Sequence, residues 1–357
     1  MNALPEYHRI LLSRMKFIGD VVLTTPVIRS LRNAYPGAFI AYMGEKNAVS
    51  LLERNPCLDE IIPFDFSRAA FVEQARVVML LRRRRFDLAL DLFGNPRSAL
   101  VTFLSGAPVR VGPDRKGRGR LYTVRVSDDG RPKSAIEFHN QSLRAVGIPV
   151  SSNTTEVFVT ADERERMRGL LGREHPPLDT GRPIVGIHPG ATWPAKHWPV
   201  ERFAALAERL MTSGVQVLVT AGTGDDRTLD ALRRNVPGPL RTMEGLPLRQ
   251  LAALLALCSA FVCNDAGPMH IAAAVGTPTI GLFGPGEEDI WFPYNPALGH
   301  RALRKDVPCH PCHLDVCNRE ASGYMECMAL LTVDEVFAAV QQALREKGPA
   351  FGQRENP

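Results

Sequence analysis

Asp20 is an acidic residue placed where it could do chemistry, because it stands between a predicted strand and a predicted helix. The apolar run Ile10–Ser13 predicts the strand, and Val21–Ala34 predicts the helix. An aspartate at a helix start commonly caps it, and the local sequence favours this interpretation. A carboxylate facing a cleft can instead act as a general base, kept anionic by the helix N-terminus. Pro26 either starts the regular helix or kinks one that begins at Asp20.

A second polar segment, His188–Pro199, follows the predicted strand Ile184–His188 and carries a lysine. As a point charge with three donors, the ammonium of Lys196 can neutralise a diphosphate without demanding one geometry. The spacing alone is equally compatible with a solvated loop lysine. Thr192 and His197 belong to the same loop, which therefore brings several polar groups to the end of one strand.

The most informative run is CNDAGPMH at residues 263–270, where a predicted strand turns into a helix. Gly267 lets the backbone approach a ligand, and the unpaired N–H groups of the first helical turn would attract a pyrophosphate. A carboxylate repels phosphate, so Asp265 either caps the helix or bonds a hydroxyl or the Lys196 ammonium. His270 lies inside the helix, where a packed core histidine is more common than a ligand.

Asp226 occupies a similar position, after the predicted strand Val215–Thr220 and a Gly-rich turn. Its carboxylate can accept a hydrogen bond from a ribose or sugar hydroxyl. It can equally cap the helix expected over Asp226–Asn235.

Basic residues crowd the segment 110–133. The whole chain has 43 Lys and Arg against 38 Asp and Glu, and this net charge of +5 does not indicate a nucleic-acid-binding protein. We expect the Gly-containing segment to form one long loop that holds a multiply anionic substrate, lies on anionic lipid, or is simply solvated. Its central basic residues are Arg115, Lys116, Arg118 and Arg120.

Apolar strand-like runs alternate with amphipathic helical stretches along the chain, which is the pattern of parallel sheets covered on both faces. The pattern halts in the stretch 169–183, rich in Gly, Pro and charge, and restarts at Ile184. A chain of 357 residues is long enough for two domains. We therefore predict two Rossmann-like, doubly wound α/β domains, residues 1–175 and 176–331, that face a central cleft. A capped helix with one apolar stripe, residues 332–347, follows.

Composition excludes several classes of protein. Hydrophobic residues make up 45% and charged residues 23%, which argues against disorder, collagen and coiled coils. We find no clean apolar stretch of about 20 residues that predicts a membrane span. The first nine residues do not resemble a signal peptide, so we expect a cytoplasmic protein.

Four of the seven cysteines, Cys309, Cys312, Cys317 and Cys327, form a C-x₂-C-x₄-C-x₉-C array. That spacing can ligate zinc or an iron–sulfur cluster, can form a disulfide, or can belong to reduced packing thiols. The odd total fits reduced thiols better than a disulfide framework. All three interpretations stay open.

Three motifs extend in order over nearly the whole chain: RMKFIGD at residues 14–20, HPGA with KHWP at 188–199, and DAGPMH with GTP at 265–278. Together they resemble the ADP-heptose:lipopolysaccharide heptosyltransferase family, glycosyltransferase family 9. The resemblance implies a GT-B fold whose C-terminal helix packs back across the domains, and a metal-independent, inverting transfer of heptose from an ADP-sugar. It also implies that the N-terminal domain binds the acceptor, the lipid A–core oligosaccharide, and that the C-terminal domain binds the nucleotide sugar.

The resemblance further assigns roles to residues. Asp20 matches the base that deprotonates the acceptor hydroxyl, and Lys196 matches the group that stabilises the diphosphate leaving group. Asp265 matches an aspartate near the phosphate and sugar of the donor. Ala266 departs from the pattern, because a serine or threonine commonly follows that aspartate. The other donor-binding assignments are Thr192, Asp226, Gly267, Pro268, Met269 and His270, and we assign acceptor binding to Arg115, Lys116, Arg118 and Arg120.

Other functions share this architecture. The same fold can use another nucleotide sugar or acceptor, or can bind a nucleotide sugar without catalysis, although the presence of both Asp20 and Lys196 argues against the second. A dinucleotide-dependent oxidoreductase would need a G-x-G-x-x-G fingerprint, which this chain lacks. The basic segment leads us to expect peripheral contact with the inner face of the inner membrane. No cofactor is expected for catalysis, and a structural metal is one interpretation of the cysteine array.

Overall fold

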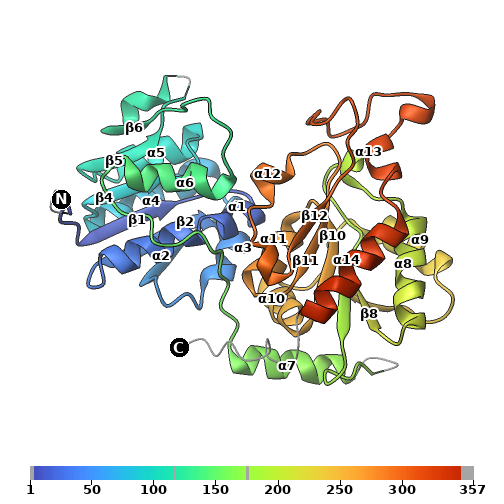
Figure 1. Ribbon diagram of the computed structural model, residues 1–357. Helices are drawn as coiled ribbons and strands as arrows, with labels where there is room; N and C mark the ends of the chain where they lie inside the picture. The colour runs from blue at the N-terminus through green and yellow to red at the C-terminus, as the bar shows by residue number, and fades with distance from the viewer. Residues whose placement is uncertain (1–3, 116, 174–176, 347–357) are drawn as a thin grey trace. The chain divides into compact units, whose positions relative to one another are not determined.

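The computed structural model describes residues 4–115, 117–173 and 177–346 (Figure 1). The chain divides into two compact units, Met1–Phe158 and Val159–Pro357, which we call the N-terminal and C-terminal units. Each unit contains one six-stranded sheet in which neighbouring strands run parallel. The prediction of two doubly wound α/β domains is therefore confirmed.

The sheet of the N-terminal unit has the strand order β3-β2-β1-β4-β5-β6. The order reverses where β1 pairs with β4, so the topological switch point lies between these two strands. The strands are β1 (Arg9–Ser13), β2 (Phe39–Glu45), β3 (Glu60–Phe64), β4 (Leu88–Asp91), β5 (Val109–Pro113) and β6 (Val124–Val126). The helices are α1 (Ile18–Leu23), α2 (Thr25–Ala34), α3 (Lys46–Val49), α4 (Ala70–Arg84), α5 (Pro96–Leu104) and α6 (Ala135–Arg144).

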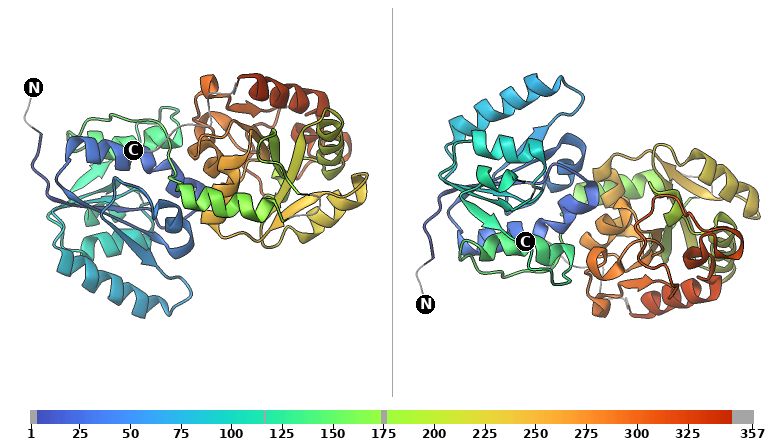
Figure 2. Two further views of the ribbon diagram at one scale, coloured as in Figure 1. Left: turned by 90° about the horizontal axis from the view of Figure 1, so that it is seen from below. Right: turned by 90° about the horizontal axis from the view of Figure 1, so that it is seen from above.

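Helices cover both faces of this sheet (Figure 2). Successive residues of β1 point to opposite faces: Ile10 and Leu12 belong to the core cluster that α2 and α6 cover, and Leu11 to the cluster that α4 and α5 cover. All three side chains are fully buried. A strand buried on both faces needs a continuous apolar run instead of an alternating one, which explains why this strand was easy to predict.

The sheet of the C-terminal unit repeats the plan in the order β12-β11-β10-β7-β8-β9, with its switch point between β7 and β10. The strands are β7 (Ile184–His188), β8 (Gln216–Ala221), β9 (Arg241–Glu244), β10 (Ala260–Asn264), β11 (Thr279–Leu282) and β12 (Arg301–Leu303). The helices are α7 (Ala161–Leu171), α8 (Val200–Thr212), α9 (Asp226–Asn235), α10 (Leu248–Leu257), α11 (Gly267–Ala274), α12 (Glu288–Trp291), α13 (Glu326–Ala329) and α14 (Val333–Glu346).

The C-terminal helix α14 has the predicted cap and stripe. Thr332 N donates to Glu335 Oε2 at 2.9 Å, and Glu335 N donates to Thr332 Oγ1 at 3.3 Å. Val336 and Val340 are fully buried in the core cluster that α8 and β10 also line. The stripe is thus buried within the C-terminal unit, and the packing of residues 332–347 back across the domains stays a prediction. Residue 347 lies outside the described residues.

Helix α7 ends within residues 169–183, the stretch in which the alternating pattern of the sequence halts. Its side chains Met167 and Leu171 are buried, and the helix packs against α10. The two units therefore divide ahead of α7, while the expected boundary between residues 175 and 176 follows it.

Two further segments differ from expectation. The predicted helix Val21–Ala34 is two helices, α1 and α2, and Pro26 lies in the first turn of α2, so it starts a regular helix instead of kinking one. The basic segment 110–133 is not one long loop, because it contains most of β5, a 3₁₀ helix at Arg118–Leu121, and β6. Both strands are short and partly exposed, so they lack the apolar run by which the central strands are recognised. Among the described residues, no helix has the length and hydropathy of a membrane span.

Candidate active site

Asp20 lies at the carboxyl end of β1, beside the switch point of the N-terminal sheet. The residue that caps α1 by position is Phe17, and Asp20 is the third residue of the helix. Its Oδ2 accepts a hydrogen bond from Phe17 N at 3.1 Å. Asp20 therefore supports the start of α1 from within its first turn. The interpretation of Asp20 as the capping residue was wrong, because the cap position is three residues earlier, at Phe17.

An ion pair holds the other oxygen of Asp20. Asp20 Oδ1 accepts from Arg14 Nη2, and the two side chains are only 12% and 11% exposed. Arg14 is itself fixed, because its Nη1 donates to Leu92 O at 3.2 Å and its guanidinium lies 4.4 Å from the centre of the Phe93 ring. A planar guanidinium held at three points orients a carboxylate well. Each carboxylate oxygen still has a lone pair for a substrate proton.

The segment that holds Arg14 is anchored by a fully buried carboxylate, Asp91, at the end of β4. Asp91 accepts from Tyr122 OH at 2.6 Å, from Ser98 Oγ at 2.8 Å, and from the N–H groups of Phe93 and Gly94, both at 3.0 Å. Burial, and then the charge of Asp91, raise the pKa of Tyr122. Sequence reasoning missed Asp91, although an aspartate that ends an apolar run beside a Gly-Asn-Pro turn was a usable signal.

Lys196 and Asp265 meet at the switch point of the C-terminal sheet. Lys196 Nζ lies 2.6 Å from Asp265 Oδ2, and the side chains are 18% and 7% exposed. The ammonium also lies 4.6 Å from the centre of the Trp193 ring. Of the alternatives that the sequence left open for Asp265, the bond to the Lys196 ammonium is confirmed.

Asn264, the last residue of β10, holds the Lys196 loop in place. Its Nδ2 donates to Pro189 O at 2.8 Å, and its Oδ1 accepts from Trp198 N at 3.1 Å. The same side chain thus ties both ends of the segment that carries Lys196 to the strand that precedes Asp265. Sequence reasoning did not single out this residue, because an asparagine at a strand end shows no spacing that predicts contacts so distant along the chain.

Helix α11 begins with an open N-terminus. Ala266 is at the N-cap position and supplies no side-chain oxygen, while Gly267 and Pro268 form the first turn. Met269 and His270 are buried, and His270 Nδ1 lies 2.5 Å from Tyr294 OH. The structure therefore leaves backbone groups, not the side chains of Met269 and His270, as the part of this motif open to a ligand. The interpretation of His270 as a packed histidine agrees with this burial.

The third polar loop of the C-terminal unit presents a different aspartate from the expected one. Asp226 is exposed at the first position of α9, and the capping position belongs to Asp225. Asp225 Oδ2 accepts from Gly222 N at 2.8 Å and lies 3.8 Å from His188 Nε2. Burial lowers the pKa of His188 despite this nearby carboxylate. Thr192 is exposed in its loop.

The described basic residues that we assigned to the acceptor differ in exposure. Arg118 is half-buried, and its Nε donates to Gly94 O at 3.1 Å, which anchors the segment to the end of β4. Arg115 and Arg120 are exposed, and the Arg115 guanidinium lies 5.2 Å from the centre of the Phe138 ring. Lys116 lies outside the described residues. Arg115 and Arg120 are thus the described members of this set that present charge to solvent.

The cysteine array is present as free thiols. Cys317 Sγ accepts from Met325 N at 3.3 Å, and Cys309 Sγ accepts from Arg319 Nη1 at 3.6 Å. Burial raises the pKa of Cys327. Within the described residues, no three histidine, cysteine or acidic side chains are assembled so that they could hold a metal ion.

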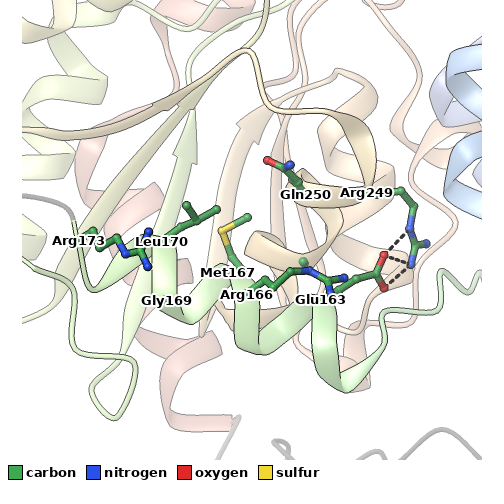
Figure 3. A pocket seen from close by; sticks show the side chains of 9 residues that line it. Glu163, Arg166, Met167, Gly169, Leu170, Arg173, Arg249 and Gln250 are labelled. Atoms are coloured by element: carbon green, nitrogen blue, oxygen red, sulfur yellow. Dashed lines mark hydrogen bonds and ion pairs between the residues drawn. The ribbon is translucent and has the colours of Figure 1, made fainter.

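One cavity of the C-terminal unit, about 490 Å³ in volume, lies between α7 and α10 and is lined by none of the predicted site residues (Figure 3). Glu163 forms an ion pair with Arg249 at 2.6 Å across it, and both side chains are largely buried. Glu163 Oε2 also accepts from Thr160 N at 2.8 Å, which caps α7. These contacts are accounted for by the packing of α7 on α10.

The chain is similar to a family model, to curated proteins and to solved structures. Residues 75–321 match the family model for glycosyltransferase family 9 (heptosyltransferase). Lipopolysaccharide heptosyltransferase 2 of Salmonella typhimurium is 30% identical over 358 residues, which cover 95% of this chain and 99% of that protein. The family 9 glycosyl transferase of Veillonella parvula DSM 2008 has a TM-score of 0.84 at 23% identity, covering 96% of this chain and 98% of that one. The E. coli ADP-heptose LPS heptosyltransferase II has a TM-score of 0.78 at 26% identity, covering 95% and 99%.

Two Rossmann-like units, each with charged groups at its switch point, define a glycosyltransferase of the GT-B class. The chain belongs to glycosyltransferase family 9, the heptosyltransferases. The family resemblance stated from the sequence motifs is confirmed.

Proposed function

We propose that this enzyme transfers heptose from ADP-heptose to the inner core of lipopolysaccharide, with inversion at the anomeric carbon and without a metal ion. The observation that carries the proposal is the placement of Asp20 and Lys196, each beside the switch point of its own sheet and each fixed by an ion pair. The N-terminal unit takes the acceptor in this proposal, and the C-terminal unit takes the donor.

Asp20 is the general base. It accepts the proton of the acceptor hydroxyl while the hydroxyl oxygen forms a bond to the anomeric carbon of the donor. The bond from that carbon to the diphosphate oxygen breaks, and ADP leaves with the electron pair. The new bond forms on the face opposite the one that ADP leaves, which inverts the configuration. The hydrogen bond from Phe17 N and the ion pair with Arg14 hold Asp20 for this step.

Lys196 and the N–H of Gly267, the first residue of α11, stabilise the charge that develops on the leaving diphosphate. Pro268 has no N–H and the Met269 N–H donates to Ala266 O at 3.0 Å, so Gly267 is the residue of this turn whose N–H can bind a phosphate. The arriving diphosphate competes with Asp265 for Lys196, so donor binding replaces one ion pair by another. Asp265 is then free to accept a hydrogen bond from a hydroxyl of the donor. This supply of positive charge is our reason for proposing that no metal is needed.

Ala266 affects one part of the proposal, the identity of the donor sugar. The alanine supplies no hydroxyl at the N-cap of α11, so the contact to the donor that a serine or threonine would make is missing. We propose that the remaining contacts suffice for ADP-heptose, and a panel of other ADP-sugars tests this point.

We also propose peripheral contact with the inner face of the inner membrane, where the acceptor is a glycolipid. Arg115 and Arg120 are exposed, as this contact requires. Binding of this kind weakens with salt. Sedimentation with anionic vesicles at low and high salt checks it, and equal sedimentation with neutral vesicles would contradict it.

The structure of the product tests the proposed reaction. The enzyme is incubated with ADP-heptose and a heptose-deficient lipid A–core acceptor, and the purified product is examined by mass spectrometry and NMR. One added heptose with an anomeric configuration opposite to that of the donor is the expected result. Retention of configuration would rule out a single displacement, and transfer of a different sugar from the panel would change the donor.

A further inference from the structure

A cavity of about 470 Å³ in the N-terminal unit is lined by residues to which the sequence analysis gave no role, although one of them, Lys16, belongs to the motif RMKFIGD. It lies at the carboxyl edge of the sheet, where Lys16 follows β1, Phe66 follows β3, and Asn95 and Arg97 begin α5. Lys16 directly precedes Phe17, the residue whose N–H donates to Asp20. The cavity therefore opens on the same edge of the same sheet as the proposed base.

Two cations of this cavity lie beside one aromatic ring. Lys16 Nζ is 4.6 Å from the centre of the Phe66 ring, and the guanidinium carbon of Arg97 is 5.2 Å from the same centre. Both side chains are half-buried. Two like charges that line one cavity repel each other, and partial burial reduces the screening that water provides.

Neither cation has a carboxylate partner within 4.0 Å in the part of the chain that the structure describes. The nearby acidic residues are already engaged: Asp65 pairs with Lys46 at 3.5 Å and with Arg68 at 3.7 Å, and Glu73 pairs with Arg76. Arg14 and Lys196, by contrast, each face a carboxylate. The charge in this cavity is thus left uncompensated by the protein.

A neutral donor accompanies the two cations. Asn95 Oδ1 accepts from Ser98 N at 2.7 Å and so caps α5, and the described residues give Asn95 Nδ2 no partner. This amide lines the cavity together with Lys16 and Arg97. Two cations and an amide N–H around one space are the groups that bind an anion with several oxygens.

We propose that Lys16 and Arg97 form a subsite for an anionic group of the acceptor, a phosphate or a sugar carboxylate. This inference rests on the proposed function, because it takes the acceptor to bind beside Asp20. The Arg97 guanidinium bonds two oxygens of the anion at once, and Lys16 contributes a point charge. The anion places the acceptor so that its hydroxyl reaches Asp20, and it relieves the repulsion between the two cations.

The test compares steady-state kinetics of the wild type, Lys16→Gln and Arg97→Gln with ADP-heptose and a heptose-deficient lipid A–core acceptor. Each variant is expected to raise the KM for the acceptor by about tenfold, the cost of losing one hydrogen bond to a charged group. The KM for ADP-heptose and the kcat at saturating acceptor stay within twofold. Arg83→Gln is the matched control, because Arg83 is exposed in α4 and should leave all three constants unchanged. Equal melting temperatures exclude misfolding.

A second acceptor, from which the phosphates have been removed, separates the two sources of the anion. If the subsite binds a phosphate, the wild type and the variants should have the same KM for this acceptor. If the subsite binds a carboxylate, the KM of the wild type should stay lower than that of the variants. Acceptor KM values within twofold of wild type for both variants on both acceptors would overturn the subsite. If the wild type transfers no heptose at all, the proposed function fails instead, and equilibrium binding of the same acceptors by the three proteins tests the subsite on its own.

Discussion

Each of the two sheets has an ion pair at its switch point, but the residue with the assigned role is the anion in one pair and the cation in the other. In the N-terminal unit the group assigned to chemistry is a carboxylate, Asp20, and its partner is the guanidinium of Arg14. In the C-terminal unit the assigned group is an ammonium, Lys196, and its partner is the carboxylate of Asp265. In the proposed function, the same topology therefore holds an acid–base group on one sheet and a charge stabiliser on the other.

The two pairs also differ in how firmly the partner is held. Arg14 is fixed by a backbone carbonyl and an aromatic ring besides Asp20, so it keeps the carboxylate in place. Lys196 ends a flexible four-carbon stem and can leave Asp265 for a diphosphate. If the proposed roles hold, the comparison teaches that the base is positioned in advance, while the charge stabiliser is exchanged between an internal anion and the donor.

Replacing Asp20 by Asn should have the largest effect. A general base contributes about 10²–10⁴-fold, so kcat should fall by that factor. Binding of ADP should not change, since the nucleotide is assigned to the other unit. Rates of ADP release at saturating substrates and calorimetric titration with ADP measure the two quantities. Glu53→Gln, at an exposed carboxylate of the same unit, is the control. A kcat within tenfold of wild type would remove Asp20 from the role of base.

Lys196→Met should come next, because it keeps the stem and removes the charge. Loss of one donor to a developing oxyanion costs about 10²–10³-fold in kcat. Unlike the Asp20 variant, this one should also weaken ADP binding, which sharpens the contrast between the two sites. The same assays check it, with Arg234→Gln on the exposed part of α9 as control. Unchanged affinity for ADP would show that Lys196 does not exchange Asp265 for the diphosphate.

Arg14→Gln should have a smaller effect on catalysis, because Arg14 acts by positioning Asp20. Misplacement of a reacting group costs up to about 10²-fold. The double variant with Asp20→Asn should be no slower than Asp20→Asn alone, since residues that act as one unit are not additive. Rates for the two single variants and the double variant form the required cycle. Additive losses would mean that Arg14 has a separate function.

The smallest expected effect is on the pH dependence of stability, through the buried His139 of the N-terminal unit. Burial, and then the charge of Arg14, lower the pKa of His139 from 6.5 to about 3. Between these values the unfolded chain binds a proton that the folded chain does not, so stability falls as pH drops below 6.5. The loss is at most about 1.4 kcal/mol per pH unit for one group.

Replacing His139 by Gln should therefore reduce the loss of stability between pH 7 and pH 5 by about 1–2 kcal/mol. Urea unfolding at the two pH values measures it. Burial also lowers the pKa of His300 in the C-terminal unit, to about 4. The same replacement at His300 is therefore the matched comparison for the pH dependence. An identical pH dependence in wild type and variant would show that His139 does not control it.

The sequence predicted the central strands of both sheets and offered the pairing of Lys196 with Asp265 as one of three alternatives. Both depend on local signals, namely apolar runs and polar motifs at strand ends. It did not predict Asp91 or Asn264, because their roles arise from hydrogen bonds to residues such as Tyr122 and Pro189 that only the fold brings near. The basic segment was wrongly expected to be a long loop, since β5 is short and the three-residue edge strand β6 has exposed or half-buried side chains, so both leave little periodicity to detect.

Turnover of the donor tests the central claim most directly. The wild-type enzyme is mixed with ADP-heptose in buffer containing EDTA, and ADP release is followed with and without the heptose-deficient lipid A–core acceptor. The account predicts rapid release of ADP that depends on the acceptor and is unaffected by EDTA. Absence of acceptor-dependent release under these conditions, with release restored by a divalent metal or by another ADP-sugar, would contradict it.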